Sequence, residues 1–176
     1  METYVSSEFH IFAPKPVQSS VGGTTEVPYK SVAGVDQDDL KFLVPAENDT
    51  YIDLNIRLFV RVKLIKLIGS DLDKTDFTGV TNNLLHSLFS QCTIALNGET
   101  VTPASNYYGY RAFFETILTY GSDAAVSHLT NGFWYLDAGD LLPCDPTAED
   151  AGFVARWNKL KQSKEVQLYG RLHSDM

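Results

Sequence analysis

The stretch YIDLNIRLFVRVKLIK, residues 51–66, indicates the fold class more clearly than any other part of the chain. Apolar residues recur at every second position from Ile52 to Leu64, and polar or charged residues stand between them, with Phe59 the exception. This period of two predicts one continuous strand over 52–66, buried along its even-numbered face and solvated along the other. One-sided strands of this kind are typical of antiparallel sheets.

The composition fits one ordinary domain that is rich in sheet. The chain has 176 residues, of which 44% are hydrophobic, and this is enough to bury a core. Nine Tyr and ten Phe suit sheets and interfaces better than helical bundles. No repeat with a period of roughly 20–50 residues is present, which argues against solenoids and propellers.

The charge pattern argues against two kinds of partner. A formal net charge of −8 repels phosphate backbones, so we expect no direct, sequence-specific binding of nucleic acid. The most apolar stretch, residues 56–69, is interrupted by four Arg and Lys residues, so we expect no membrane span. Glu2 and Glu8 flank a start that lacks the apolar run of a signal peptide. We therefore expect a soluble protein that is made in the cytoplasm.

Turn and cap signals organise the rest of the chain, which we expect to form a single domain over 1–176. Residues 1–50 are predicted to supply extended N-terminal strands, because they combine prolines, a Gly22-Gly23 turn and β-favouring residues. Residues 51–176 are predicted to form the body of the domain. Within it, Asn97-Gly98 favours a type I′ hairpin turn between strands at 91–96 and 99–102, and residues 165–176 alternate as a last strand.

Three short helices are predicted inside this body. The first covers 82–89, with Thr81 or Asn82 as its N-cap. The second covers 106–120 and stops at Gly121; apolar residues surround most of it, which predicts burial on more than one side. The third covers 122–131 and stops at Gly132, and residues 133–157 are predicted to consist largely of turns. Long strands interrupted by short helices indicate a mainly β fold, an antiparallel jelly-roll sandwich with short helical insertions.

The sequence nominates no catalytic, cofactor-binding or metal-binding residue. Asp71, Asp73 and Asp76 superficially suggest a calcium loop, but the loop lacks the central glycine and the closing glutamate, so a solvated acidic turn is the better interpretation. Cys92 and Cys144 fit reduced thiols, because they form no CxxC or Cys/His pattern. The remaining candidates lack a partner at motif spacing; they are His10, His86, His128, His173, Ser87 and Ser90.

Aromatic residues leave a second class of function open, a non-catalytic ligand- or carbohydrate-binding jelly-roll module. Trp134, Tyr135 and Tyr107 are the residues that would stack on a sugar in such a module. Three aromatics in a row at 133–135 are, however, more often a core or edge contact of a sandwich. A secretion signal or a calcium loop would favour the binding module, and the sequence contains neither.

Several of these architectural segments together resemble a known family. LHSLFSQ at 85–91, LNG at 96–98, YRAFFETILTYG at 110–121 and YGRLHSD at 169–175 occur in this order, after the long strand at 51–66. In order and spacing they resemble the major capsid protein, or hexon, of Polinton/Maverick-type elements and adintoviruses. These proteins are relatives of the double-jelly-roll capsid proteins of adenoviruses and virophages. The resemblance extends from residue 51 to 175, and more weakly to the N-terminal segment.

The resemblance implies a structural protein with no enzymatic activity, no catalytic residues and no cofactor. Its chains would self-assemble as homotrimers into pseudo-hexameric capsomers of an icosahedral shell around double-stranded DNA, next to other capsid proteins such as a penton. The protein would be made in the host cytoplasm, assemble in the nucleus and reside in the virion.

Two features depart from the family pattern. Gly109 stands where the family usually has proline, and a complete member has several hundred residues and two jelly rolls. We therefore expect these 176 residues to form an incomplete first jelly roll. Its last strand and the helix at 106–120 should then expose apolar surface and favour association.

Overall fold

The computed structural model describes residues 22–32, 39–48, 51–53, 55–137 and 150–175. The chain divides into two compact units, Met1–Tyr51 and Ile52–Met176. The described residues of the first unit form no helix or strand, although the N–H of Val32 donates to the carbonyl of Lys41 at 2.7 Å. The strands predicted for 1–50 are therefore not formed in that described part.

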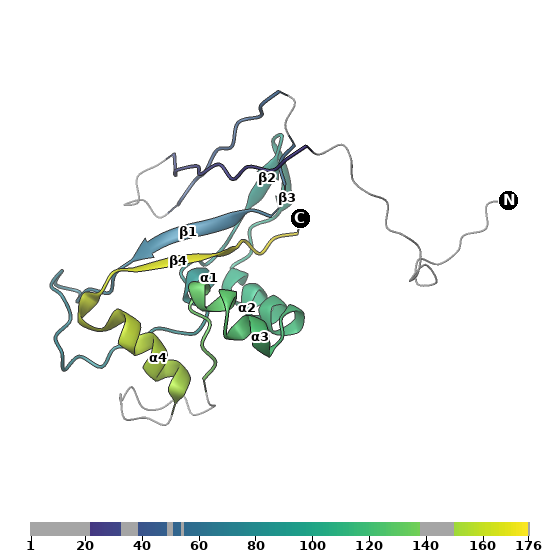
Figure 1. Ribbon diagram of the computed structural model, residues 1–176. Helices are drawn as coiled ribbons and strands as arrows, with labels where there is room; N and C mark the ends of the chain where they lie inside the picture. Colours follow the sequence, from purple (N-terminus) through teal and green to yellow (C-terminus); the bar gives the residue numbers. More distant parts are fainter. Residues whose placement is uncertain (1–21, 33–38, 49–50, 54, 138–149, 176) are drawn as a thin grey trace, which may run out of the picture. The chain divides into compact units, whose positions relative to one another are not determined.

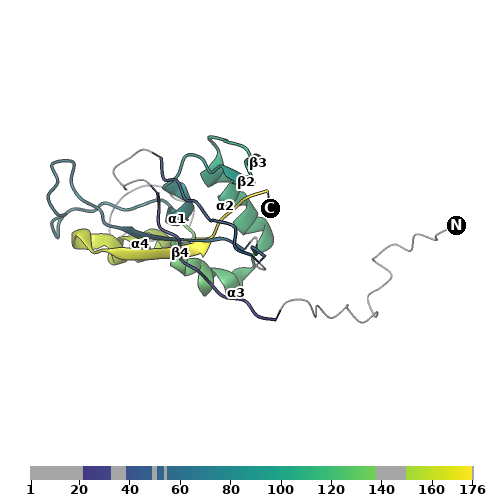
Figure 2. The same cartoon turned by 90° about the horizontal axis from the view of Figure 1, so that it is seen from above.

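The second unit is built around an antiparallel ribbon of two strands. β1 (Arg57–Val62) pairs with β4 (Val166–Arg171), and Val60 lies opposite Leu168. Figures 1 and 2 show the two strands side by side. Even-numbered residues from 56 to 66 are half-buried and odd-numbered ones are exposed, which confirms the predicted one-sided pattern. The predicted length is wrong, because the regular strand has six residues where one strand over 52–66 was expected.

We expect Val60→Asp to test this register. The substitution would place a carboxylate against the buried face of β1 and lower the free energy of unfolding by about 3 kcal/mol. Arg61→Asp is the matched control: Arg61 is exposed and lies 5.9 Å from the ring centroid of Phe59, so its loss should cost about 1 kcal/mol or less. Equal effects of the two substitutions on urea unfolding would contradict the register.

A second pair of strands forms the predicted hairpin. β2 (Ile94–Leu96) and β3 (Glu99–Thr102) are antiparallel, with a bulge between Ile94 and Ala95. The turn residues Asn97 and Gly98 both have positive φ, 52° and 87°. These angles confirm the predicted type I′ turn, which requires positive φ at both central positions.

Substituting this turn glycine should therefore destabilise the second unit. Gly98→Val puts a β-branched residue at positive φ and should cost about 1–3 kcal/mol. Gly121→Val is the matched control, because Gly121 has a φ of −87° and a Cβ there would meet no atom within 4 Å. Thermal melts of the two variants measure the difference, and a Gly98→Val melt that coincides with that of the control would reject the turn assignment.

The first helix, α1 (Leu84–Ser87), is shorter than the predicted 82–89. Asn83 is its N-cap, with a left-handed φ of 56° and no capping hydrogen bond from its side chain. The side-chain oxygen of Asn82 instead accepts from the N–H of Asn83 at 2.9 Å and from the N–H of Tyr135 at 2.7 Å. The helix therefore begins later than predicted, because Asn82 ties its start to a distant segment.

The second helix, α2 (Tyr108–Thr119), lies within the predicted range 106–120. It ends because Tyr120 takes an extended conformation. The predicted stop, Gly121, has a negative φ, so it is not a left-handed glycine cap.

The helix predicted at 122–131 is broken in two. α3 (Ser122–Ala125) is followed by a 3-10 turn, η2 (His128–Gly132). The break lies at Ser127, whose φ of −116° and ψ of −110° are not helical. Gly132 ends the second piece, as predicted.

The fourth helix, α4 (Ala151–Leu160), begins inside the range 133–157 that was predicted to be rich in turns, so that prediction is wrong over 151–157. Asp150 is its N-cap, and the carboxylate accepts from the N–H groups of Gly152 and Phe153 at 2.9 and 3.1 Å. A 3-10 turn, η3 (Lys161–Ser163), then leads into β4.

The core lies between the β1–β4 ribbon and the helices. Figure 1 shows α1, α2, α3 and α4 on one side of this ribbon. Leucines from α1, α4 and β4 join Phe133 there, and the even-numbered residues of β1 pack against them. The buried cluster consists of Leu84, Leu85, Phe133, Leu160 and Leu168.

The described residues contain two separate two-stranded sheets, β1–β4 and β2–β3. They do not display the sheets of a jelly roll, and they do not contradict one. The jelly-roll sandwich and its incompleteness therefore stay predictions.

Candidate functional site

The second unit brings together two histidines that the sequence treats as unrelated. His86 on α1 is 5% exposed, and its Nδ1 shares a hydrogen bond of 3.0 Å with the hydroxyl of Tyr108 at the start of α2. The ring of His173, in the segment after β4, stands edge-on to the ring of His86, with centroids 4.6 Å apart. Three elements thus meet at this histidine pair.

Charged groups from α2 complete the cluster. Nδ1 of His173 donates to Oε2 of Glu115 at 2.6 Å, and Nε of Arg111 donates to the other carboxylate oxygen at 2.7 Å. Arg111 also pairs with Asp175 at 2.9 Å, and the N–H of Asp175 donates to the Thr102 hydroxyl at 3.0 Å. The cluster therefore holds the segment after β4 against α2 and β3.

Burial sets the protonation of these groups. Loss of solvent, and then the charge of His173, lower the pKa of His86 to about 3, so this ring is neutral at pH 7. Burial alone would raise the pKa of Glu115, but hydrogen bonds from Arg111 and His173 outweigh it, and the pKa lies below its usual value. Glu115 is thus a carboxylate that accepts from both neighbours.

The same environment does not activate a nucleophile. Burial raises the pKa of the Cys92 thiol, and it also raises the pKa of the Tyr108 hydroxyl, so both groups keep their protons at pH 7. A protonated thiol or phenol is a weaker nucleophile than its anion. Within the described ranges, no group of three His, Cys, Asp or Glu residues has the geometry to hold a metal ion. The arrangement suits a structural clamp.

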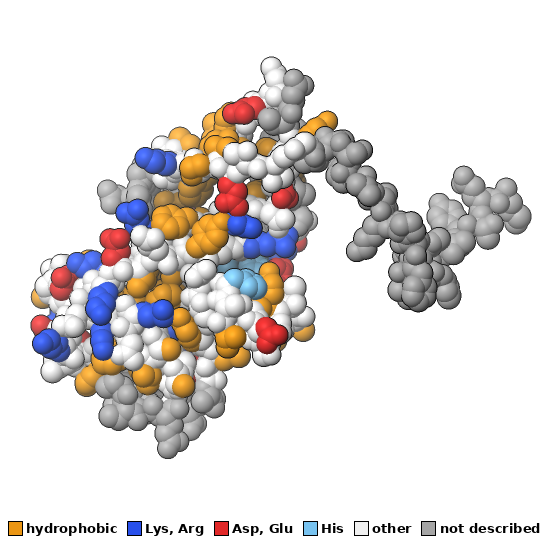
Figure 3. Space-filling view, in the orientation of Figure 1, with side chains coloured by type: hydrophobic (Ala, Val, Ile, Leu, Met, Phe, Trp, Pro, Cys, Tyr) orange, Lys and Arg blue, Asp and Glu red, His pale blue; other side chains and the backbone are white. Residues whose placement is uncertain are grey.

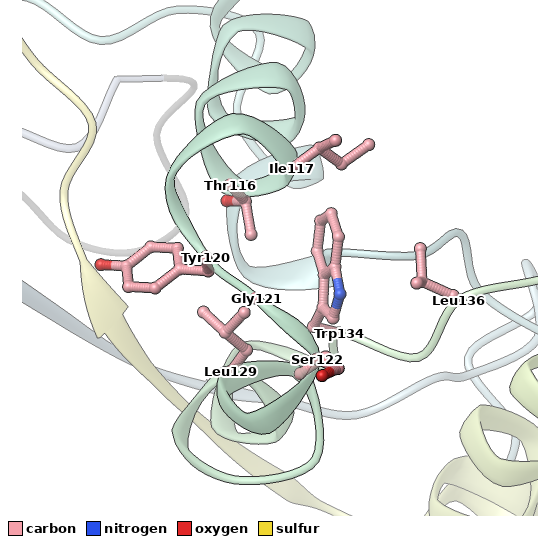
Figure 4. Close-up of a pocket in the computed structure, with 9 residues that line it drawn as sticks. Thr116, Ile117, Tyr120, Gly121, Ser122, Leu129, Trp134 and Leu136 are labelled. Carbon is pink, nitrogen blue, oxygen red and sulfur yellow. The ribbon is translucent and has the colours of Figure 1, made fainter.

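An apolar hollow of about 260 Å³ lies at the other end of α2. Figure 4 shows Ile117, Trp134 and Leu136 around it, with Tyr120 and Leu129 on the side of α3 and η2. Its lining contains no charged side chain, and the polar atoms that it includes are the hydroxyls of Thr116, Ser122 and Tyr120 and the indole N–H of Trp134. An apolar group is therefore the chemistry that it fits best.

The aromatic residues named for sugar stacking are not a platform. Trp134 is 4% exposed and its ring packs at 5.2 Å from that of Phe113. Tyr135 is half-buried beside Phe133, whereas Tyr107 is exposed at the start of α2. Stacking on a sugar needs an open ring face, and among these three residues only Tyr107 offers one.

The other candidates have simpler surroundings. Lys63 pairs with Asp71 at 2.8 Å, and Lys66 pairs with Asp73 and Asp76 at 2.6 and 2.9 Å. The acidic turn is thus held by lysine side chains. His128 is exposed and lies near the ring of Tyr120, Ser87 donates to backbone carbonyls of 82 and 83, and Ser90 is exposed; His10 and Cys144 lie outside the described residues.

The outward face of α2 is the largest departure from expectation. Tyr108, Ala112 and Thr116 form its buried face and Phe113 is half-buried, whereas the other large apolar side chains of the helix are exposed. The prediction that this helix is buried on more than one side is wrong for the described structure, although the predicted exposure of apolar surface on it is confirmed. The exposed residues, which we call the α2 stripe, are Tyr107, Tyr110, Phe114, Ile117 and Leu118.

The last strand behaves differently from α2. Leu168 of β4 is fully buried and Val166 is half-buried against the core, so the apolar face of β4 is covered by the helices. The expectation that the last strand would expose apolar surface is wrong for this face.

The comparisons with known proteins add no relative. No protein family, no curated protein and no solved structure matches the chain. Among the described residues, no helix has both the length and the apolar character needed to cross a bilayer.

Sequence reasoning missed the histidine pair because its members are far apart along the chain. The one available signal was that His86 and His173 both lie in segments with strong apolar patterns, LHSLFSQ and YGRLHSD. A histidine beside buried residues is more often buried than one in a loop, but only the packing of α1 against β4 brings the two rings together.

Proposed function

We propose that this chain is a portion of a major capsid protein, a structural protein that self-assembles into trimeric, pseudo-hexameric capsomers of an icosahedral shell. The proposal rests first on the resemblance to the hexons of Polinton/Maverick-type elements and adintoviruses, whose quoted segments form β1, α1, the β2–β3 hairpin, α2 and β4. In this proposal the protein contacts other copies of itself and neighbouring capsid proteins such as a penton, is made in the cytoplasm, assembles in the nucleus and resides in the virion.

The observation that carries the proposal is the distribution of apolar side chains in the second unit. Its buried cluster contains five large side chains, whereas many large apolar residues on β1, α2 and the loops remain exposed. Figure 3 shows hydrophobic side chains at the surface of one face, among basic ones. Monomeric proteins rarely expose so much apolar surface, and proteins that assemble do.

The polar cluster supports the same conclusion. Its groups hold α1, α2, β3 and the segment after β4 together, and their protonation states suit hydrogen bonding. A shell subunit needs a rigid surface more than it needs a reactive group. A carbohydrate-binding module is the weaker proposal, because Trp134 is buried.

Assembly of the purified 176-residue chain tests the proposal. Sedimentation velocity should give masses above that of a single chain, and negative-stain electron microscopy should show trimers or shell fragments. A dye that fluoresces on exposed apolar surface should bind the dissociated chain more than the assembled one. A monomer that melts cooperatively and does not associate at any concentration tested would reject the proposal.

A further inference from the structure

We propose that the α2 stripe is a contact surface for a second copy of this chain, in which two α2 helices pack antiparallel across a twofold axis. The inference deepens the proposed self-assembly, on which it rests, by naming the surface and the symmetry of one contact. The residues of the stripe recur at positions i, i+3, i+7, i+10 and i+11 from Tyr107 to Leu118, so they form one continuous strip along the helix.

The orientation of α2 is the first support. Its buried face consists of Tyr108, Ala112 and Thr116, whereas the stripe carries larger apolar groups whose exposed fractions run from 47% for Ile117 to 84% for Leu118. A surface helix of a globular protein normally turns its apolar side inward. The large apolar side chains left on its outer side indicate that a partner covers them.

The area of the stripe is the second support. Its three aromatic rings, each 60–70% exposed, and the aliphatic side chains with neighbouring Leu136 offer together roughly 600 Å² of apolar surface, if an aromatic side chain presents about 200 Å² and an aliphatic one about 100 Å². Stable interfaces bury about 600–1,000 Å² on each partner. The stripe together with Leu136 therefore reaches the lower end of the range for a stable contact.

Charge favours a second copy as the occupant. The chain carries a net charge of −8, so most contacts between two copies bring like charges together. The stripe contains no charged residue, and the charged residues of α2, Arg111 and Glu115, are bonded to each other beside it at 2.7 Å. A contact across a twofold axis must be complementary to itself, and an uncharged apolar strip meets that condition.

The apolar hollow fits the same geometry. It lies at the C-terminal end of the stripe, where Ile117 and Leu136 form part of its lining (Figure 4). In an antiparallel pair the N-terminal end of one stripe lies opposite the C-terminal end of the other. The exposed ring of Tyr107 from one copy is thus placed next to the hollow of the other, near Leu118.

Leu118→Glu tests the surface. The side chain of Leu118 faces solvent in the single chain, so the substitution should leave the thermal melt of the second unit unchanged while shifting the dissociation constant at least tenfold in sedimentation velocity. Leu67→Glu is the matched control, because it makes the same change at a fully exposed leucine outside the stripe and should leave the association as it is.

Disulfide trapping tests the antiparallel geometry in a chain with Cys92→Ser and Cys144→Ser. Tyr107→Cys combined with Leu118→Cys should give a covalent dimer on oxidation, whereas each single substitution should not. Within one helix the two positions lie eleven residues, or about 16 Å, apart, so they cannot bridge internally. Dimers from the single Tyr107→Cys variant, or none from the double variant, would overturn the antiparallel contact.

The outcomes separate this inference from the proposed function. If the unaltered chain stays monomeric, both fail. If it assembles and Leu118→Glu leaves the assembly unchanged, or if Leu67→Glu disrupts it as strongly, the inference is overturned and the proposed function stands. If Leu118→Glu weakens association and Leu67→Glu does not, the stripe is the contact.

Discussion

Replacing Arg156 by methionine should lower the free energy of unfolding by about 3 kcal/mol, because the guanidinium is the main polar link between α4 and the rest of the second unit. Arg156 is 3% exposed. Its Nε donates to the carbonyl of Val80 at 2.8 Å, its Nη1 donates to the carbonyl of Tyr135 at 2.5 Å, and its Nη2 pairs with the carboxylate of Asp137. Methionine fills much of the same space but leaves all three acceptors without their donor.

Two comparisons make this prediction specific. Arg156→Lys keeps the charge but presents a single ammonium in place of the planar guanidinium. It should therefore lower the free energy of unfolding, but by less than Arg156→Met does. Arg171→Met removes an exposed arginine from β4 and should change stability by less than about 0.5 kcal/mol. Urea unfolding of the three variants measures the series. A loss below about 1 kcal/mol for Arg156→Met would show that α4 is held by its apolar face alone.

Local patterns predicted the elements that depend on neighbours in sequence. The one-sided alternation around β1 and the Asn97-Gly98 turn are confirmed, because strand periodicity and positive φ at a two-residue turn are properties of short segments. The range of α2 is also nearly correct. The missed helix α4 had a local signal as well: Asp150 as N-cap, followed by apolar residues at helical spacing.

Features that depend on distant contacts were not predictable in this way. The start of α1 is set by Asn82, whose side chain binds a backbone group more than 50 residues away. The side of α2 that becomes buried depends on what packs against it, and apolar residues around most of the helix left that choice open. The two histidines, and Arg156 and its three hydrogen-bond acceptors, likewise come together only when the chain folds.

The unfolding free energy should also fall as the pH is lowered from 6.5 toward 3, because the folded chain keeps His86 neutral. Burial and the charge of His173 lower the pKa of His86 from 6.5 to about 3. Between these two pH values the unfolded chain binds a proton that the folded chain does not. The stability contribution of His86 is therefore fully present above pH 6.5 and is lost at up to about 1.4 kcal/mol per pH unit below it.

Protonation of Glu115 at low pH also lowers the free energy of unfolding. Its pKa in the folded chain lies below 4.5, so its contribution is present above that pH and is lost as the pH falls through the folded value. The groups that face His86 are the Tyr108 hydroxyl from α2 and the His173 ring from the segment after β4, and His173 in turn binds Glu115. A pH titration of the unaltered chain thus reports on the whole cluster, and a substitution is needed to isolate one ring.

The substitution His86→Gln isolates the contribution of the His86 ring. The amide can still bond the Tyr108 hydroxyl but does not titrate, so the variant should lose about 2 kcal/mol less than the unaltered chain between pH 6.5 and 5. His128→Gln is the control, because it makes the same change at an exposed histidine outside the cluster. Urea unfolding at intervals of half a pH unit measures all three chains. Parallel curves for His86→Gln and the unaltered chain would mean that the His86 ring accepts its proton in the folded state as readily as in the unfolded one. Burial of the histidine pair between α1, α2 and the segment after β4 would then be wrong.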